Sequence, residues 1–301
     1  MKTSKIRYFV FALIAAILVS FSALSLTGCP PDDPDDGDKP PAGISVPGNT
    51  LAEKLAWVLI TDNVTNGETY VITVNADEAI TPFELFCIGR SDITIILWGS
   101  GGERIISLSS NGNLFNVGVN VTLVLDKNIT LEGISGNNTA LVRVGYGGAL
   151  EMREGAKITG NTSYNGGGVL VYSGRTFTMN GGVISGNTAT NGGGGVYVFT
   201  DATFTMNGGV ISGNTATNNG GGVYVGDTFR IVNGTVYGSN ESDTSLKNTV
   251  GSSGAALYIV GTTSSSGTAQ RGTFSDTTWT SAGDLSATDD TIKVVNGELL
   301  K

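Results

Sequence analysis

The chain has 301 residues, of which 45 are glycine, only 14% are charged and none is histidine. Its formal net charge of −9 argues against nucleic acid and anionic membrane surfaces as partners, because both repel an acidic protein. The absence of histidine removes the commonest general base and metal ligand, and the high glycine content is typical of a chain with frequent tight turns.

Residues 1–28 have the features of a bacterial secretory signal. Three basic residues and no acid precede a long apolar stretch, and Leu26–Cys29 reads LTGC. This sequence matches the lipobox, at which Cys29 is diacylated and becomes the new N-terminus. We therefore expect a lipoprotein signal peptide, with Cys29 as the lipidation site that holds the protein in the membrane. An uncleaved membrane anchor is the alternative, because the apolar run is nearly long enough to span a bilayer.

The next segment, residues 29–47, is rich in proline and aspartate. Pro30–Gly43 reads PPDDPDDGDKPPAG and holds five of the seven prolines of the chain. A segment of this composition cannot bury a core and repels itself, so we expect an extended, disordered tether. We interpret its aspartates as solvated spacing rather than as a cation site.

Residues 48–66 are predicted to contain a short helix. Leu51, Leu55 and Val58 follow helical spacing, and Thr50 with Glu53 fits a capping box. We expect this helix to cover the start of the strand-rich region that follows, because an unpaired strand edge invites aggregation. A partner-binding helix is the alternative.

The strand-rich region repeats with a fixed period. The block FTMNGGVISGNTATN starts at Phe177 and again at Phe204, and GGVYV starts at Gly194 and again at Gly221. Both pairs are offset by 27 residues. Each period holds three short stretches in which apolar and polar residues alternate, separated by glycine-rich or ISGN-like corners. A strict period of this kind predicts a repeat architecture.

We therefore predict an all-β fold, a single-stranded right-handed parallel β-helix, over residues 67–260, with the clearest repeats at 134–240. The length allows about nine or ten coils at ~25 residues each. Residues 261–301 are predicted to form a loop and capping strands at the other end. The glycine runs lack the Gly-Lys-Ser/Thr of a phosphate loop, and the repeats lack the recurring Asp of a calcium-binding roll.

Stacking of identical coils should place equivalent residues in columns. We expect the columns of phenylalanine, methionine and isoleucine to fill the interior, and the column of asparagine to form an amide ladder along one corner. Val236 starts a degenerate copy of the ISGN turn, with Asn240 in the asparagine position. The predicted ladder pairs are Phe177 and Phe204, Met179 and Met206, Ile184 and Ile211, and Asn187 and Asn214.

A further predicted column consists of Leu170, Tyr197 and Tyr224. If it points outward, it is a candidate surface for binding sugar or protein, because aromatic rings combine an apolar body with a polar edge. If it points inward, it is part of the core. The sequence leaves both orientations open.

The alternation of FxxN and GGxx motifs resembles the repeats of the chlamydial polymorphic membrane proteins and of related β-helix repeat lipoproteins of spirochaetes. The motifs extend over about residues 130 to 260. The matching segments are Phe177–Asn180 and Phe204–Asn207 for FxxN, and Gly147–Leu150, Gly167–Leu170, Gly194–Tyr197 and Gly221–Tyr224 for GGxx. The resemblance implies a surface-displayed right-handed β-helix with an adhesive role.

Three functions follow as hypotheses. The first is a lipid-anchored binding, adhesion or display module on the outside of a bacterial outer membrane, which binds a host protein or glycan through many weak contacts. The second is a non-catalytic coat or antigenic protein. The third is a periplasmic carbohydrate-active β-helix enzyme, although a fold alone does not define an activity.

Catalysis is the least favoured of the three. Glycoside hydrolysis needs two carboxylates that flank a groove, and the repeats contain one charge cluster, formed by Glu151, Arg153, Glu154 and Lys157. We predict no catalytic residue, no cofactor and no metal site. With Cys29 lipidated, Cys87 has no disulfide partner and is expected to be a buried, inert thiol.

Overall fold

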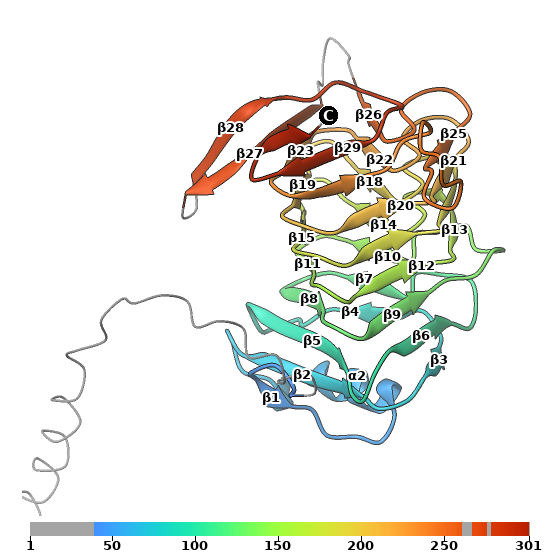
Figure 1. Ribbon diagram of the computed structural model, residues 1–301. Helices are drawn as coiled ribbons and strands as arrows, with labels where there is room; N and C mark the ends of the chain where they lie inside the picture. The colour runs from blue at the N-terminus through green and yellow to red at the C-terminus, as the bar shows by residue number, and fades with distance from the viewer. Residues whose placement is uncertain (1–38, 261–266, 276–277, 301) are drawn as a thin grey trace, which may run out of the picture. The chain divides into compact units, whose positions relative to one another are not determined.

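Strands at equivalent positions of successive coils pair in parallel and form four sheets that run along a β-solenoid (Figure 1). The structure, a computed structural model, describes residues 39–260, 267–275 and 278–300. All of these except Lys39 belong to one unit, Pro40–Lys301. The predicted parallel β-helix architecture is therefore confirmed over the repeat region.

Each sheet is named here by a letter, and its strands are given in the order in which they pair. Sheet A contains β1 (Ile44–Ser45), β2 (Thr69–Val74), β5 (Ile93–Gly99), β8 (Val121–Leu125), β11 (Ala149–Met152), β15 (Thr176–Met179), β19 (Thr203–Met206), β23 (Thr228–Ile231), β27 (Thr268–Ser275) and β28 (Thr278–Asp284). Sheet B contains β3 (Glu78–Ile80), β6 (Arg104–Leu108), β9 (Ile129–Glu132), β12 (Lys157–Thr159), β16 (Val183–Ser185), β20 (Val210–Ser212), β24 (Gly234–Val236), β29 (Ile292–Val295) and β30 (Glu298–Leu300).

The two remaining sheets are smaller, and only the later coils contribute a strand to the fourth. Sheet C contains β4 (Phe83–Leu85), β7 (Phe115–Val117), β10 (Val142–Val144), β14 (Val169–Val171), β18 (Val196–Val198), β22 (Val223–Val225) and β26 (Leu257–Ile259). Sheet D is shorter and contains β13 (Thr162–Asn165), β17 (Thr188–Gly192), β21 (Thr215–Ala216) and β25 (Thr249–Val250).

The interior is filled by columns of like residues. Phe177 of β15 pairs with Phe204 of β19, and their ring centroids lie 4.7 Å apart with the planes inclined by 4°. Phe229 of β23 continues the stack at 5.0 Å. Met179 pairs with Met206 and Ile184 with Ile211 in the same way, and all are fully buried. Burial of these columns is the main stabilising contribution that the repeats make.

The corners depend on glycine because the coils approach closely there. A Cβ atom on Gly194 would lie 2.4 Å from the carbonyl oxygen of Gly221 in the next coil. No side chain fits at that distance, so the GGVYV block keeps its glycines for steric reasons.

A buried amide ladder runs along one corner. Asn187 Nδ2 donates to Asn214 Oδ1 at 3.1 Å, and Asn214 Nδ2 donates to Asn248 Oδ1 at 3.0 Å. Asn161 and Asn137 extend the ladder in the other direction.

The last asparagine of this ladder, Asn248, corrects the sequence interpretation. Asn248 occupies the position predicted for Asn240, because the chain inserts a loop after Val236 before it returns to the corner.

The corner beside this ladder also differs from the prediction. Residues such as Thr188 and Thr215, interpreted from the sequence as turn, form the short strands of sheet D. Thr and Asn provide turn chemistry in isolation, but a stacked neighbour above and below gives their backbone groups partners, so extended pairing prevails.

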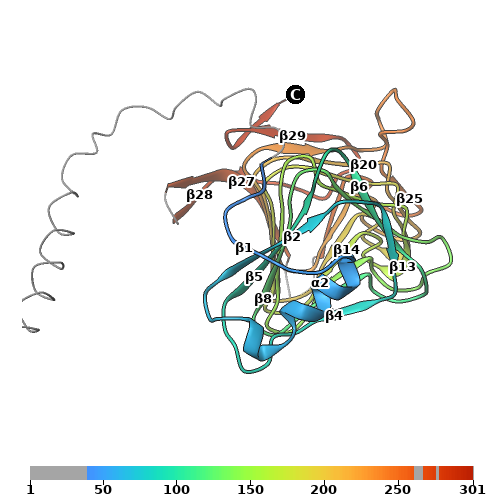
Figure 2. The ribbon, with the colours of Figure 1, turned by 90° about the horizontal axis from the view of Figure 1, so that it is seen from below.

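One end of the solenoid is covered by helix α2 (Leu51–Val58), whose buried side is formed by Leu51, Lys54, Leu55 and Val58 (Figure 2). The predicted capping box is present, with Thr50 accepting from the backbone of Glu53. A 3-10 turn, η1 (Thr61–Asn63), follows. The Cys87 thiol lies beneath the helix, 3.8 Å from the Val58 carbonyl oxygen. Burial raises the pKa of Cys87, which keeps its thiol protonated.

The other end is closed by antiparallel strands. β27 pairs with β28, and β29 pairs with both β24 and β30, in antiparallel register. Sheet C consequently has seven strands, fewer than the nine or ten coils expected. The expected number was too high because it counted residues outside the predicted repeat region of 67–260, and because some coils are longer than ~25 residues. Val223 and its partner Leu257, for example, are 34 residues apart.

The N-terminal boundaries differ slightly from the sequence interpretation. Strand β1 lies within residues 29–47, the stretch assigned to the tether, and pairs in parallel with β2. The predicted signal peptide, Cys29 and the tether before Lys39 lie outside the described residues. Among the described residues, none forms a helix with the length and apolar character needed to cross a membrane.

Candidate functional site

The outer face of sheet C carries a continuous column of side chains. Strands β10, β14, β18 and β22 of this sheet alternate buried, partly exposed and buried, so the middle residue of each points outward. Tyr197 and Tyr224 therefore face outward, as does Leu170. In pairing order the column is Glu84, Asn116, Arg143, Leu170, Tyr197, Tyr224 and Tyr258.

The tyrosines of this column stack on one another. The rings of Tyr197 and Tyr224 are 4.2 Å apart and inclined by 7°, and Tyr258 follows at 5.1 Å. Their ring faces thus cover each other along the solenoid, and only ring edges and hydroxyl groups remain for a ligand. Burial, together with the neighbouring Tyr224, raises the pKa of Tyr197 well above its ordinary value, so this phenol stays neutral.

A second, shorter aromatic group lies beside the column. Tyr172 and Phe199 each follow directly after a strand of sheet C, and their rings are 4.9 Å apart. Phe199 also contacts Tyr197 at 5.0 Å. The guanidinium carbon of Arg143 lies 4.4 Å from the Tyr172 ring centroid on the other side. Aromatic packing therefore holds Arg143 in place.

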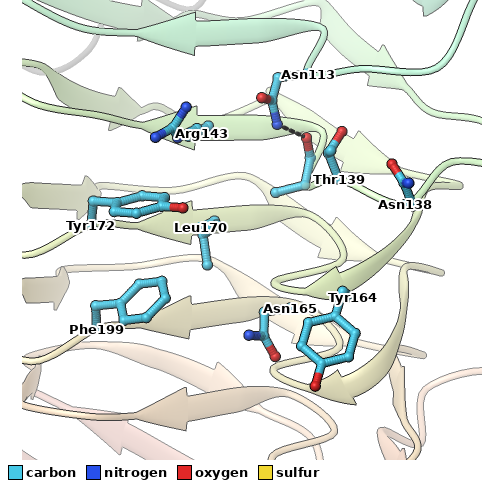
Figure 3. A pocket seen from close by; sticks show the side chains of 10 residues that line it. Asn113, Asn138, Thr139, Arg143, Tyr164, Asn165, Leu170, Tyr172 and Phe199 are labelled. Atoms are coloured by element: carbon cyan, nitrogen blue, oxygen red, sulfur yellow. Dashed lines mark hydrogen bonds between the residues drawn. The ribbon is translucent and has the colours of Figure 1, made fainter.

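An open pocket of about 280 Å³ lies where this face meets the corner loops (Figure 3). The wall of the pocket on the side of sheet C is formed by Arg143, Leu170, Tyr172 and Phe199. The opposite side is formed by residues of the loops and of β13, which are Asn113, Asn138, Thr139, Ala140, Tyr164 and Asn165. The volume is close to the lower end of the range of ~300 Å³ and above that is typical of small-ligand sites.

Several polar groups of the pocket keep hydrogen-bonding capacity. Asn113 Nδ2 donates to the Ala140 carbonyl at 2.6 Å, and Asn165 Oδ1 accepts from Asn191 at 2.9 Å. Among the described residues, Asn113 Oδ1 and Asn165 Nδ2 have no hydrogen-bond partner. Arg143 makes no ion pair within the described residues, and its Nε is buried without a hydrogen-bond partner there.

The charge cluster singled out in the sequence lies elsewhere. Within the described residues, three of its four members form ion pairs, and Glu154 forms none. Arg153 bridges Asp126 and Glu151 at 2.7 Å each, and Lys157 contacts Glu103 at 2.9 Å. A hydrogen bond from Thr130, together with Lys157, lowers the pKa of Glu103. Arg153 and Asp126 link neighbouring coils beside sheet A, whereas Lys157 reaches across the coil of β9 to Glu103 beside sheet B. Within the described residues, no group of three or more acidic or cysteine side chains is arranged to hold a metal ion.

The sequence interpretation found the column but missed most of the pocket. It aligned the motif Gly147–Leu150 with Gly167–Leu170, whereas Leu150 pairs with Phe177 in sheet A and faces inward. The residue that pairs with Leu170 is Arg143. Recognition of Val142-Arg143-Val144 as a copy of Val169-Leu170-Val171 would have identified Arg143 from sequence alone.

Comparisons with protein families, with curated proteins and with solved structures find no significant match for this chain. The fold class is therefore established by the structure itself as a parallel β-solenoid, and any function must be argued from the site.

Proposed function

We propose that the protein is a lipid-anchored binding module displayed on the outer surface of a bacterial cell. The observation that carries this proposal is the open pocket on the outer face of sheet C, in which amide, guanidinium and aromatic groups converge. Convergent polar groups on an otherwise apolar wall are the usual features of a ligand site.

The anchoring half of the proposal is supported by sequence. The segment Leu26–Cys29 matches a lipobox, and a proline- and aspartate-rich stretch separates it from β1. A lipid on Cys29 followed by a tether would hold the solenoid near the membrane while leaving its faces accessible. The FxxN and GGxx motifs, which resemble those of chlamydial and spirochaetal surface proteins, favour display on the outside.

The binding half of the proposal is tested by cell adhesion. Cells that display the full-length chain are placed on immobilised host matrix proteins and glycans, and bound cells are counted. Leu170→Glu puts a carboxylate beside Arg143 in the pocket wall. Thr205→Glu is the matched control, because it adds the same side chain to the outer face of sheet A.

We expect wild-type and Thr205→Glu cells to adhere and Leu170→Glu cells to lose adhesion by about tenfold or more, as loss of a central contact in a binding site usually does. Adhesion no greater than that of cells lacking the protein would instead indicate a passive coat protein. An equal loss of adhesion in both variants would show that the outer face of sheet C has no special role in adhesion.

A further inference from the structure

We propose that the pocket on sheet C binds an acidic oligosaccharide, with the carboxylate or sulfate group of the sugar paired to the guanidinium of Arg143. This inference rests on the proposed binding function and adds the chemical class of the ligand. It is carried by an arginine without an ion-pair partner in the part of the chain that the structure describes, a ring of amide groups and one exposed aromatic ring, all around the same opening.

Arg143 is the first observation. The chain carries a net charge of −9, so carboxylates outnumber cations, yet Arg143 forms no ion pair in the described part of the chain. The nearest acid in its column, Glu84, is two strands away and accepts a hydrogen bond from Asn116 at 2.6 Å. Because Arg143 lines the pocket and has no ion-pair partner among the described residues, an anionic ligand in the pocket would supply one.

The amide groups are the second observation. Asn113 Oδ1 is free to accept and Asn165 Nδ2 is free to donate, because each amide uses its other atom within the protein. The side chain of Asn138 has no hydrogen bond among the described residues. A sugar hydroxyl both donates and accepts, so a ring of such amides is suited to it.

Tyr164 is the third observation. This residue is 61% exposed, and it is the one aromatic residue of the pocket without a ring contact to another aromatic residue in the described structure. Figure 3 shows its ring beside Asn165, across the opening from Tyr172 and Phe199. The free ring offers an apolar platform with a polar edge, onto which the less polar face of a pyranose can pack.

The same surface is poorly suited to an acidic peptide. Extended peptides usually bind by adding a strand to an unpaired sheet edge. In the wall of the pocket β10 pairs with both β7 and β14, and β14 also pairs with β18, so no edge is available. A ligand in this pocket must therefore be recognised by side chains. The amide side chains are suited to hydroxyl groups, and the guanidinium is suited to one anionic group.

The test uses the full-length chain, purified in detergent, and ligands built on one core. These are lactose, 3′-sialyllactose, lactose carrying a 3′-sulfate, and hexaglutamate as an acidic peptide. The variants are Arg143→Gln and Tyr164→Ala. Arg175→Gln is the matched control, because Arg175 also lies over a tyrosine ring, at 5.0 Å from the centroid of Tyr146, but outside the pocket. Unchanged thermal unfolding confirms that each variant folds.

We expect the wild-type chain to bind the two acidic sugars in preference to lactose. Arg143→Gln should weaken this binding by roughly 10- to 100-fold, as loss of a charge-assisted hydrogen bond does. Tyr164→Ala should weaken binding of all sugars, and Arg175→Gln should leave it unchanged.

Binding of lactose and sialyllactose with equal affinity, or of hexaglutamate alone, would overturn the inference while the chain remained a binding module. Acidic-sugar binding that survives Arg143→Gln would also overturn it. Absence of binding to these probes, with adhesion to matrix proteins intact, would reject the acidic sugar alone. Absence of both probe binding and adhesion would reject the proposed binding function as well.

Discussion

Among single residues, the buried asparagines have the most demanding environment in the solenoid. Asn214 has no exposed surface. Its Oδ1 accepts from both the backbone and the side chain of Asn187, and its Nδ2 donates to the Ile184 carbonyl at 2.9 Å. The side-chain amide of Asn214 therefore forms hydrogen bonds with Asn187 and Ile184 of the preceding coil and with Asn248 of the following coil. A buried polar group that loses its partner costs about 1–3 kcal/mol.

Replacement of Asn214 by alanine should lower the free energy of unfolding by roughly 2–5 kcal/mol, because several buried groups lose partners at once. Asn207→Ala provides the control. Asn207 donates to Asn180 at 2.8 Å in an equivalent ladder that is exposed, so water replaces the lost bond, and the change should stay within ~0.5 kcal/mol. Urea unfolding followed by circular dichroism measures both. Similar decreases in the free energy of unfolding of the two variants would show that burial of the asparagine ladder does not determine its contribution to stability.

Residues inside the two near-identical sequence blocks could be placed from sequence, whereas residues of diverged coils were missed, even where the 27-residue offset persists, as it does from Arg143 to Leu170. Phe177 and Phe204 occupy equivalent positions because the same block surrounds both. Arg143 stands in a coil whose sequence has diverged, and its neighbours in the pocket come from loops that change length between coils. The orientation of Tyr197 was also undetermined, because an alternating Val-Tyr-Val segment is compatible with either face until the strand is placed against the core.

Of the elements, helix α2 was predicted correctly because its signals are local. Helical spacing and the capping box lie within one short stretch, and the structure adds a contact that no sequence signal indicates. The carboxylate of Glu78 accepts from the Leu51 backbone N–H at 2.8 Å. Capping strands were expected within residues 261–301, but the antiparallel pairing of β27 to β30 was not. This pairing and the short strands of sheet D depend on partners far away in the chain, which local patterns do not define.

The cover formed by α2 should be important for stability. Leu55→Ala removes a fully buried side chain at the end of the core and should cost about 2–5 kcal/mol. Ala52→Gln, on the exposed side of the same helix, should have little effect. A further expected result is self-association of Leu55→Ala on gel filtration, because loosening of the helix uncovers the first coil. A fully stable, monomeric Leu55→Ala protein would show that α2 does not protect that end.

At the scale of the whole molecule, the account combines a regular solenoid with one specialised face. The outward column of sheet A contains Glu151, Thr178, Thr205 and Arg230 in β11, β15, β19 and β23 and no aromatic residue at these positions, whereas sheet C presents arginine, leucine and tyrosines. Coil stacking depends on the residues that face inward, so it does not account for this difference between the outer faces. The proposed lipid on Cys29 and the tether would make this face accessible from outside the cell.

The most direct test of surface display is protease digestion of intact cells, with permeabilised cells as the control. The proline- and aspartate-rich segment before β1 should be cut wherever protease reaches it, whereas the closely stacked coils should resist. We predict release from intact cells of a fragment that begins close to Ile44, while a periplasmic marker stays whole. Protection of the full chain until the cells are permeabilised would contradict display on the outer surface.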